Sequence, residues 1–258
     1  MKQNLHVVKV GGHLVNDPEA LDQVLTAFAS LDGAKILVHG GGRHATELAK
    51  SLGLTPKMIE GRRITDPAML DVAVMSYAGL SNKKITAALQ RLGVNALGLS
   101  GADGNCIQSL KRPVSDIDYG LVGDISHINT SVFSSLIREG LVPVLCAITH
   151  DKKGQLLNTN ADTIAAKVAI AMNVIFDVRL FYCFEHAGVL HDISNPTDVI
   201  SSLTEIQMND LIDNQVIHQG MVPKLHNGFD ALKNGVADVI ISNVDAMITI
   251  NAPKTVLK

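Results

Sequence analysis

Three charged residues stand where an ordinary structural role explains them poorly as a set. Lys9 interrupts the apolar run at residues 5–10, and a buried ammonium group is costly unless an anion lies beside it. Lys224 follows Pro223 in the first turn of an expected helix, where a lysine is mildly unfavourable. Asp162 opens another expected helix. Singly, they could be an edge-strand lysine, a solvated lysine and a helix cap. Together they could hold and neutralise a bound anion.

Two glycine-rich loops add backbone donors to these charges. His39-Gly40-Gly41-Gly42 follows an expected strand and opens a helix, so bare amides would lie at the positive end of the helix dipole. Gly11-Gly12 directly follows the strand of Lys9, at the strand end where α/β folds bind ligands. A tight turn with positive φ is the alternative for the first loop, but three glycines exceed what one turn requires. The pattern favours anion binding.

Other functions could use the same glycines. Gly40-x-Gly42-x-x-Ala45 matches a dinucleotide-binding pattern, but Glu60, at the distance of the expected acidic residue, does not end a clear strand. An esterase oxyanion loop would need a GxSxG nucleophile motif, and the segment 98–101 (Gly-Leu-Ser-Gly) does not match it. A GxxxxGK[ST] motif is also missing, which excludes a P-loop enzyme.

The whole-chain composition limits the choice of function. The chain has 258 residues, 47% of them apolar, no tryptophan and a net charge of −3. It has no basic block that would follow a nucleic acid and no apolar stretch near the ~20 residues of a membrane span. No signal peptide is visible, so we expect a soluble cytoplasmic protein. Cys106, Cys146 and Cys183 form no CxxC pair, which predicts reduced, buried thiols rather than disulfides or a zinc site.

Strand-type and helical patterns alternate along the chain. Strands are expected at 5–10, 35–39, 94–99, 141–148, 174–184 and 236–242, and helices at 18–31, 43–52, 68–92, 131–139, 161–172, 205–213 and 222–234. Ser81 is a plausible cap dividing the helix at 68–92. Residues 106–129 suggest a hairpin excursion. This alternation predicts an α/β fold, a three-layer αβα sandwich around a mainly parallel sheet.

Four segments, in this order and spacing, resemble the N-acetyl-L-glutamate kinases of the amino acid kinase family. They are 7–12 (VVKVGG), 39–42 (HGGG), 158–162 (NTNAD) and 220–224 (GMVPK). Further matches are 61–65 (GRRIT), 98–104 (GLSGADG) and 120–123 (GLVG), so the likeness covers nearly the whole chain. It implies the amino acid kinase fold and phosphorylation, with ATP and Mg²⁺, of the γ-carboxylate of N-acetyl-L-glutamate in arginine biosynthesis.

The resemblance also implies roles for individual residues. Lys9 and Lys224 would reach the phosphoryl group, and Asp162 would orient both. The remaining residues would bind the substrate (Gly41, Gly42, Arg63, Asn158, Asn160) or the ATP phosphates and nucleotide (Gly11, Gly12, Gly40, Glu185, Gly188), with Arg63 on the α-carboxylate. No protein side chain is expected to hold a metal, because Mg²⁺ would arrive with ATP. A carboxylate acceptor is already ionised, so no general base is needed.

The implied organisation has two lobes that share a sheet. Residues 1–175 would bind the acylglutamate and form a dimer, and residues 176–258 would bind ATP, although composition does not mark the boundary. Because Lys9 lies so near the start of the sequence, no helix is expected to precede the first strand. Arginine-inhibited hexameric members of the family use such a helix, so an arginine-insensitive homodimer is expected.

Two departures from the family pattern affect the site. Glu185 stands where the family usually has aspartate, in the stretch Phe184-Glu185-His186-Ala187 before Gly188. Arg43 directly after the glycines is unusual. With Arg62, it raises the hypothesis of a more acidic acyl group, for example succinyl; the alternative is that both arginines face solvent.

Two further interpretations remain. One is another amino acid kinase, such as a carbamate, aspartate or uridylate kinase. Arg63 and the segment 158–162 favour an acylglutamate kinase over these. The other is a non-catalytic nucleotide- or metabolite-sensing module, with Glu185 as a mark of decay. Retention of Lys9, Asp162 and Lys224 together argues against that second interpretation.

Overall fold

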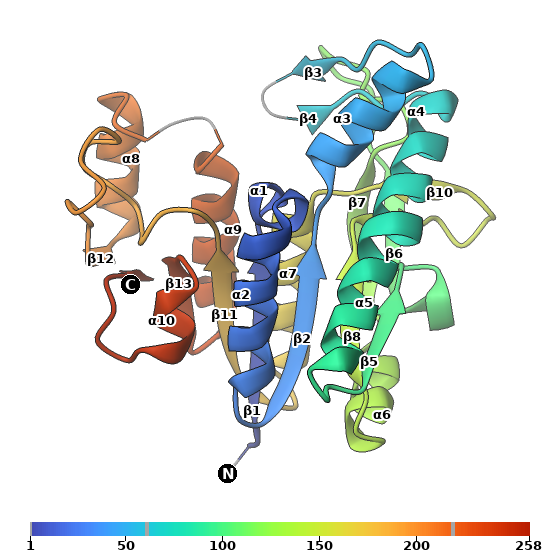
Figure 1. Cartoon of the computed structure of the whole chain (residues 1–258). Helices are drawn as coiled ribbons and strands as arrows, with labels where there is room; N and C mark the ends of the chain where they lie inside the picture. Colours follow the sequence, from blue (N-terminus) through green and yellow to red (C-terminus); the bar gives the residue numbers. More distant parts are fainter. Residues whose placement is uncertain (1, 60–61, 218–219) are drawn as a thin grey trace.

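A large, mainly parallel sheet forms the centre of the computed structural model, which describes residues 2–59, 62–217 and 220–258 (Figure 1). Glu60 and Gly61, which belong to the dinucleotide interpretation and to the 61–65 motif, lie outside these ranges. The strand order is β12-β14-β13-β11-β1-β2-β8-β5, and only β13 and β14 pair antiparallel. The strands are β1 (Asn4–Val10), β2 (Ala34–His39), β5 (Ala96–Leu99), β8 (Val142–Cys146), β11 (Asp177–Cys183), β12 (Ser202–Leu203), β13 (Asp238–Ser242) and β14 (Thr255–Leu257).

Helices cover both faces of this sheet, so the predicted three-layer fold is confirmed. Successive side chains of a strand point to opposite faces. In β1, Leu5 and Val7 join one apolar core, whereas Val8 and Val10 join the other. The first core contains residues of α7 (Ala161–Met172) and α9 (Val222–Lys233), and the second contains residues of α2 (Pro18–Ser30) and α5 (Asn82–Arg91). By the same alternation, Lys9 faces the α7 side.

Two smaller sheets and several further helices complete the fold. The segment expected to be a hairpin excursion contains β6 and β7, which pair antiparallel and thus confirm that expectation. They join a second sheet of order β10-β9-β6-β7, and β3 pairs with β4. These strands are β3 (Met58–Ile59), β4 (Arg62–Arg63), β6 (Ile107–Lys111), β7 (Gly123–Ile128), β9 (Ile148–His150) and β10 (Leu156–Asn158). The other helices are α1 (Gly12–Asn16), α3 (Gly42–Ser51), α4 (Pro67–Ala73), α6 (Thr130–Arg138), α8 (Glu205–Asp213) and α10 (Asp245–Ile248).

The expected break at Ser81 is wrong. The helix α4 continues through a π-helical segment, Val74–Ser81, directly into α5. Ser81 has helical backbone angles (φ −66°, ψ −46°), and its side chain makes no capping hydrogen bond. A π turn accommodates an extra residue without ending the helix. Here it places the Tyr77 ring against Gly41, where an added Cβ would lie only 2.7 Å from the ring.

Two expectations from composition can be compared with the described residues. The three cysteines are buried and free of disulfide bonds, as predicted. Among the described helices, we find none with both the length and the apolar character needed to cross a membrane.

Candidate active site

The three charged residues singled out in the sequence meet at one point. Lys9 is near the end of β1, Asp162 is in the first turn of α7, and Lys224 is in the first turn of α9. Lys9 Nζ lies 2.6 Å from Asp162 Oδ1, and Lys224 Nζ lies 3.4 Å from Asp162 Oδ2. Lys9 and Asp162 are both 6% exposed. One buried carboxylate therefore holds two ammonium groups side by side.

The local electrostatics favour the ionised form of Asp162 and act in opposite directions on Lys9. Burial acts to raise the pKa of Asp162, but the attraction of Lys9 and Lys224 outweighs it and lowers that pKa overall. Burial lowers the pKa of Lys9, and Lys224 lowers it further, while Asp162 opposes both effects. The Tyr182 hydroxyl donates a hydrogen bond of 3.1 Å to the main-chain oxygen of Asp162, which ties the start of α7 to β11. With both lysines protonated, the cluster has one more positive than negative charge, which suits an anion.

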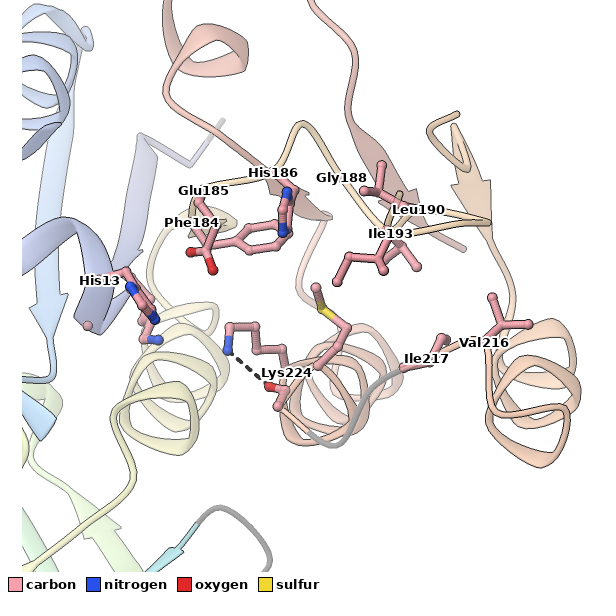
Figure 2. Close-up of a pocket in the computed structure, with 16 residues that line it drawn as sticks. His13, Phe184, Glu185, His186, Gly188, Leu190, Ile193, Val216, Ile217 and Lys224 are labelled. Carbon is pink, nitrogen blue, oxygen red and sulfur yellow. Dashed lines mark hydrogen bonds between the residues drawn. The ribbon is translucent and has the colours of Figure 1, made fainter. Parts of the chain in front are cut away.

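A cavity of about 360 Å³ lies on the β11 side of the cluster (Figure 2). Figure 2 shows His13, Glu185 and Lys224 at one end and apolar side chains at the other. The apolar lining consists of Phe184, Val189, Leu190, Ile193, Val216, Ile217 and Met221. Such a cavity can hold a flat apolar ring at one end and an anionic tail at the other.

The glycines of this cavity differ in what they contribute. Gly12 lines it at the start of α1, with open space where a side chain would be. Gly11 also lines it, but its N–H donates to Cys183 O at 2.8 Å, so this amide is already used within the sheet edge. Gly188 lines the cavity as well, and a Cβ there would lie 2.6 Å from Thr255 Oγ1. Packing alone therefore requires glycine at position 188. Glu185 is exposed in the same cavity.

A second cavity, of about 190 Å³, lies on the β2 side. Its lining includes four groups expected from the sequence: the glycines 40–42, Arg63, Asn158 and Asn160. Arg63 is 7% exposed, and its Nη2 donates to Gly42 O and Thr46 Oγ1, each at 2.8 Å. Its Nη1 is buried and has no hydrogen-bond partner within the described parts of the chain. The guanidinium group is thus fixed in place with donor capacity left over.

The two asparagines have separate structural partners. Asn158 is 9% exposed, and its side-chain amide donates to Thr65 Oγ1 at 3.0 Å. Asn160 is exposed and caps α7, since its Oδ1 accepts from Thr163 N at 3.0 Å. The cap accounts for the asparagine at 160, whereas Asn158 is held as a preset polar group in the cavity wall.

His39 packs beneath the glycine loop. It is fully buried, its Nδ1 lies 2.7 Å from Gly40 O, and its Nε2 lies 3.1 Å from Asn82 Nδ2. Because Asn82 Nδ2 can only donate, Nε2 must accept and Nδ1 must carry the proton. Burial lowers the pKa of His39 to about 4. A neutral imidazole therefore supports the loop from below.

Sequence reasoning misplaced one residue and missed others. Arg43 does not line the cavity of Arg63; it is exposed and lines a third cavity with His13 and Glu185. Helix α3 begins at Gly42, and the turn of this helix directs the next side chain away from the Arg63 side. Arg62 does line the Arg63 cavity, together with residues that the sequence did not mark: Tyr77, Arg112 and Asp124. The pairing of β6 with β7, which sets Leu110 opposite Asp124, is the signal that could have linked Arg112 to Asp124.

Comparisons with known proteins agree with this architecture. The model of the amino acid kinase family matches residues 4–243. The chain is 50% identical to acetylglutamate kinase from Bacteroides fragilis, over 96% of this chain and 95% of that one. It is 46% identical to acetylglutamate kinase from Cytophaga hutchinsonii, over 98% and 97% of the two chains. A crystal structure from Streptococcus mutans superposes with a TM-score of 0.80 at 25% identity, covering 98% of each chain. The chain belongs to the amino acid kinase family.

Proposed function

We propose that this protein is a kinase that transfers the terminal phosphoryl group of ATP to the γ-carboxylate of N-acetyl-L-glutamate, a step of arginine biosynthesis. The observation that carries the proposal is the Lys9–Asp162–Lys224 cluster between two cavities of different character. The names of relatives with 50% and 46% identity support the choice of acceptor.

In this proposal the two lysines neutralise the charge that spreads over the transferred phosphoryl group. At ~4 Å and an effective dielectric near ~20, each could contribute up to about 4 kcal/mol. An effect of that size matches the ~10³-fold or larger contribution of a single positioned cation in other phosphotransferases. Asp162, held anionic by both lysines, keeps them in place. The acceptor carboxylate is ionised at neutral pH, so it attacks without a general base.

Each cavity then receives one substrate. Arg63 binds the α-carboxylate of the acceptor through its free Nη1, which suits the planar geometry of a guanidinium. Asn158 bonds the amino-acid part, and Gly41 and Gly42 approach the carboxylate under attack. On the other side, the apolar wall takes the adenine, and amides near Gly12 approach the phosphates. Gly40, expected from the sequence to bind ATP, lines the acceptor cavity instead, so it would approach the phosphoryl group from the acceptor side. Glu185 and Gly188 border the nucleotide.

Magnesium fits this arrangement as part of the nucleotide complex. The groups that face the phosphate end are ammonium groups and amide donors, which suit phosphate oxygens rather than a cation. Within residues 2–59, 62–217 and 220–258, no group of three His, Cys, Asp or Glu side chains could hold a metal ion. Bound through phosphates and water, Mg²⁺ would neutralise charge on the phosphoryl oxygens.

A hydroxamate assay tests the activity directly, since hydroxylamine traps an acyl phosphate. We expect hydroxamate from N-acetyl-L-glutamate and ATP, and much less from aspartate. Carbamate and UMP do not give a hydroxamate, so they are tested by ADP release, which should be much lower with either of them than with N-acetyl-L-glutamate. ATP binding without any product would instead support a non-catalytic sensing module and reject the proposal.

Lys9→Ala tests the role of the cluster. It should lower kcat by about 10³-fold while changing the KM for either substrate much less. Lys84→Ala, which removes an exposed lysine of α5, is the matched control and should retain activity. A Lys9→Ala enzyme with unchanged turnover would show that Lys9 does not act on the phosphoryl group.

We also propose a cytoplasmic homodimer in which residues 1–175 bind the acceptor and form the dimer, and residues 176–258 bind ATP. The division is supported by the cavities: the described lining of the acceptor cavity ends at Thr163, whereas most of the nucleotide cavity follows Cys183. Free, buried cysteines suit a reducing compartment. Sizing at working concentration should give a dimer, and a hexamer or a monomer would contradict the assembly.

A further inference from the structure

The acceptor cavity carries more positive charge than N-acetyl-L-glutamate can match. Its charged lining consists of three guanidinium groups, from Arg62, Arg63 and Arg112, and one carboxylate, from Asp124. In the proposed function the γ-carboxylate of the acceptor lies toward the Lys9 cluster, and its α-carboxylate is bound by Arg63. With Asp124 also counted, one guanidinium group has no negative partner when N-acetyl-L-glutamate is bound.

Arg112 is held as a built part of this cavity. Its Nε lies 3.1 Å from each carboxylate oxygen of Asp124, and its Nη2 also bonds Asp124 Oδ1. The guanidinium carbon lies 5.4 Å from the centre of the Tyr119 ring. Its main-chain N–H donates to Val122 O at 2.8 Å. Only 21% of the side chain is exposed, so it is not a freely moving surface charge.

The donor capacity of Arg112 is not exhausted by these contacts. Its Nη1 is buried and has no hydrogen-bond partner among the described residues, as is also true of Nη1 of Arg63. A buried guanidinium N–H without an acceptor costs free energy, and this cost is recovered when an anion binds. Two arginines in one small cavity thus each retain an unused donor. Arg62, in contrast, is exposed.

We infer that Arg112 binds a carboxylate at the end of the substrate's acyl chain, so that the preferred acceptor is an N-acylglutamate with an acidic acyl group, such as N-succinyl-L-glutamate. The inference rests on the proposed kinase activity and changes its preferred acceptor from the N-acetyl compound to a more acidic N-acylglutamate. It replaces Arg43 with Arg112 as the source of the extra positive charge, since Arg43 lies outside this cavity. Asp124 holds the guanidinium in place and leaves its outer edge for the ligand.

The test compares three acceptors: N-acetyl-, N-butyryl- and N-succinyl-L-glutamate. The butyryl chain has the length of the succinyl chain without its carboxylate, so it separates charge from size. We expect kcat/KM for the succinyl compound to exceed that for the butyryl compound by about 10- to 100-fold, the range of a charge-assisted hydrogen bond. Most of this difference should lie in KM.

Arg112→Gln should remove that preference, lowering kcat/KM for the succinyl compound about 10- to 100-fold more than for N-acetyl-L-glutamate. Arg138→Gln, at an exposed position at the end of α6, is the control and should keep the preference. Arg62→Gln is the competing variant: if it, rather than Arg112→Gln, removes the preference, the assignment to Arg112 is overturned. Arg112→Lys keeps the positive charge but loses the paired N–H donors of the guanidinium group. Its preference for the succinyl compound should lie between those of the wild type and Arg112→Gln.

The outcomes separate the inference from the function on which it rests. Turnover of N-acetyl-L-glutamate equal to or above that of the succinyl compound overturns the inference and leaves the kinase proposal standing. An equal loss of kcat/KM for all three acceptors in Arg112→Gln would mean that Arg112 only supports the fold. That result also overturns the inference. No turnover of any acceptor by the wild-type enzyme rejects the proposed function itself. The wild-type series decides the substrate even if a variant fails to fold.

Discussion

The buried imidazole of His39 makes the stability of the protein depend on pH. Its Nε2 accepts from Asn82, and protonation would set an N–H against that donor. The Asn82 amide cannot simply turn over, because its nitrogen also donates to Val144 O at 2.9 Å and its oxygen accepts from Lys83 Nζ at 3.2 Å. Lys83 further disfavours a second positive charge.

The size of the effect follows from proton linkage. The pKa of His39 falls from 6.5 to about 4 on folding, mainly through burial. Between these values the unfolded chain binds more protons than the folded chain, so acid favours unfolding. The contribution of His39 is complete above the unfolded pKa and is lost as the pH falls toward about 4. Between about pH 7.5 and about pH 5, integration gives about 2 kcal/mol.

Urea unfolding at these two pH values measures the loss. We expect the free energy of unfolding of the wild type to fall more than that of His39→Gln, with a difference of about 2 kcal/mol between the two pH dependences. Because only the pH dependences are compared, the pH-independent change in the free energy of unfolding caused by the substitution cancels. Identical pH dependences in the two proteins, or an NMR titration of the His39 ring above 6.5, would refute the reasoning.

Three more substitutions, one of them with a control variant, test other parts of the structure. Asp162→Asn leaves two lysines without their anion. The free energy of unfolding should therefore fall by about 3 kcal/mol or more, and kcat should fall at least ~10²-fold. Unchanged kinetics would show that Asp162 does not orient the lysines. Gly120→Ala would place a Cβ 2.3 Å from the main-chain oxygen of Thr65, so it should destabilise by about 1–3 kcal/mol and raise the acceptor KM. Gly53→Ala, at a similar positive φ but in open space, should cost less in urea unfolding. Lys35→Met removes three hydrogen bonds to carbonyls at the end of α2, so stability should fall by about 1–2 kcal/mol with kcat unchanged.

The main elements were predictable where local signals coincide. The expected bounds 161–172 and 205–213 agree with α7 and α8, since each helix starts at a capping side chain, Asn160 and Thr204. The strand of Lys9 was equally clear from its apolar neighbours. The π-helical segment was not predictable, because its wide turn depends on packing of Tyr77 against Gly41 from a different part of the chain.

The same distinction applies to the site. Lys9 stood out because a charge within an apolar strand has few structural explanations. Arg112 did not, since an arginine in a polar hairpin resembles any exposed charge, and only Tyr119 and Asp124 reveal that it is held. For Arg43, position beside the glycines was misleading, because adjacency along the chain does not fix the direction of a helical side chain.

The central position of β1 has a mechanical consequence. It hydrogen-bonds β2 over six residue pairs and β11 over seven. The two cavities that would receive the phosphoryl donor and acceptor in the proposed function therefore lie on two flanks of one continuous backbone. Sliding one flank past the other would break all the hydrogen bonds between β1 and a neighbouring strand. Bending the outer loops would leave these interstrand hydrogen bonds intact. The separation of donor and acceptor is therefore set by the spacing of neighbouring strands. Changes in the periphery could alter which molecules enter without altering how far the phosphate travels.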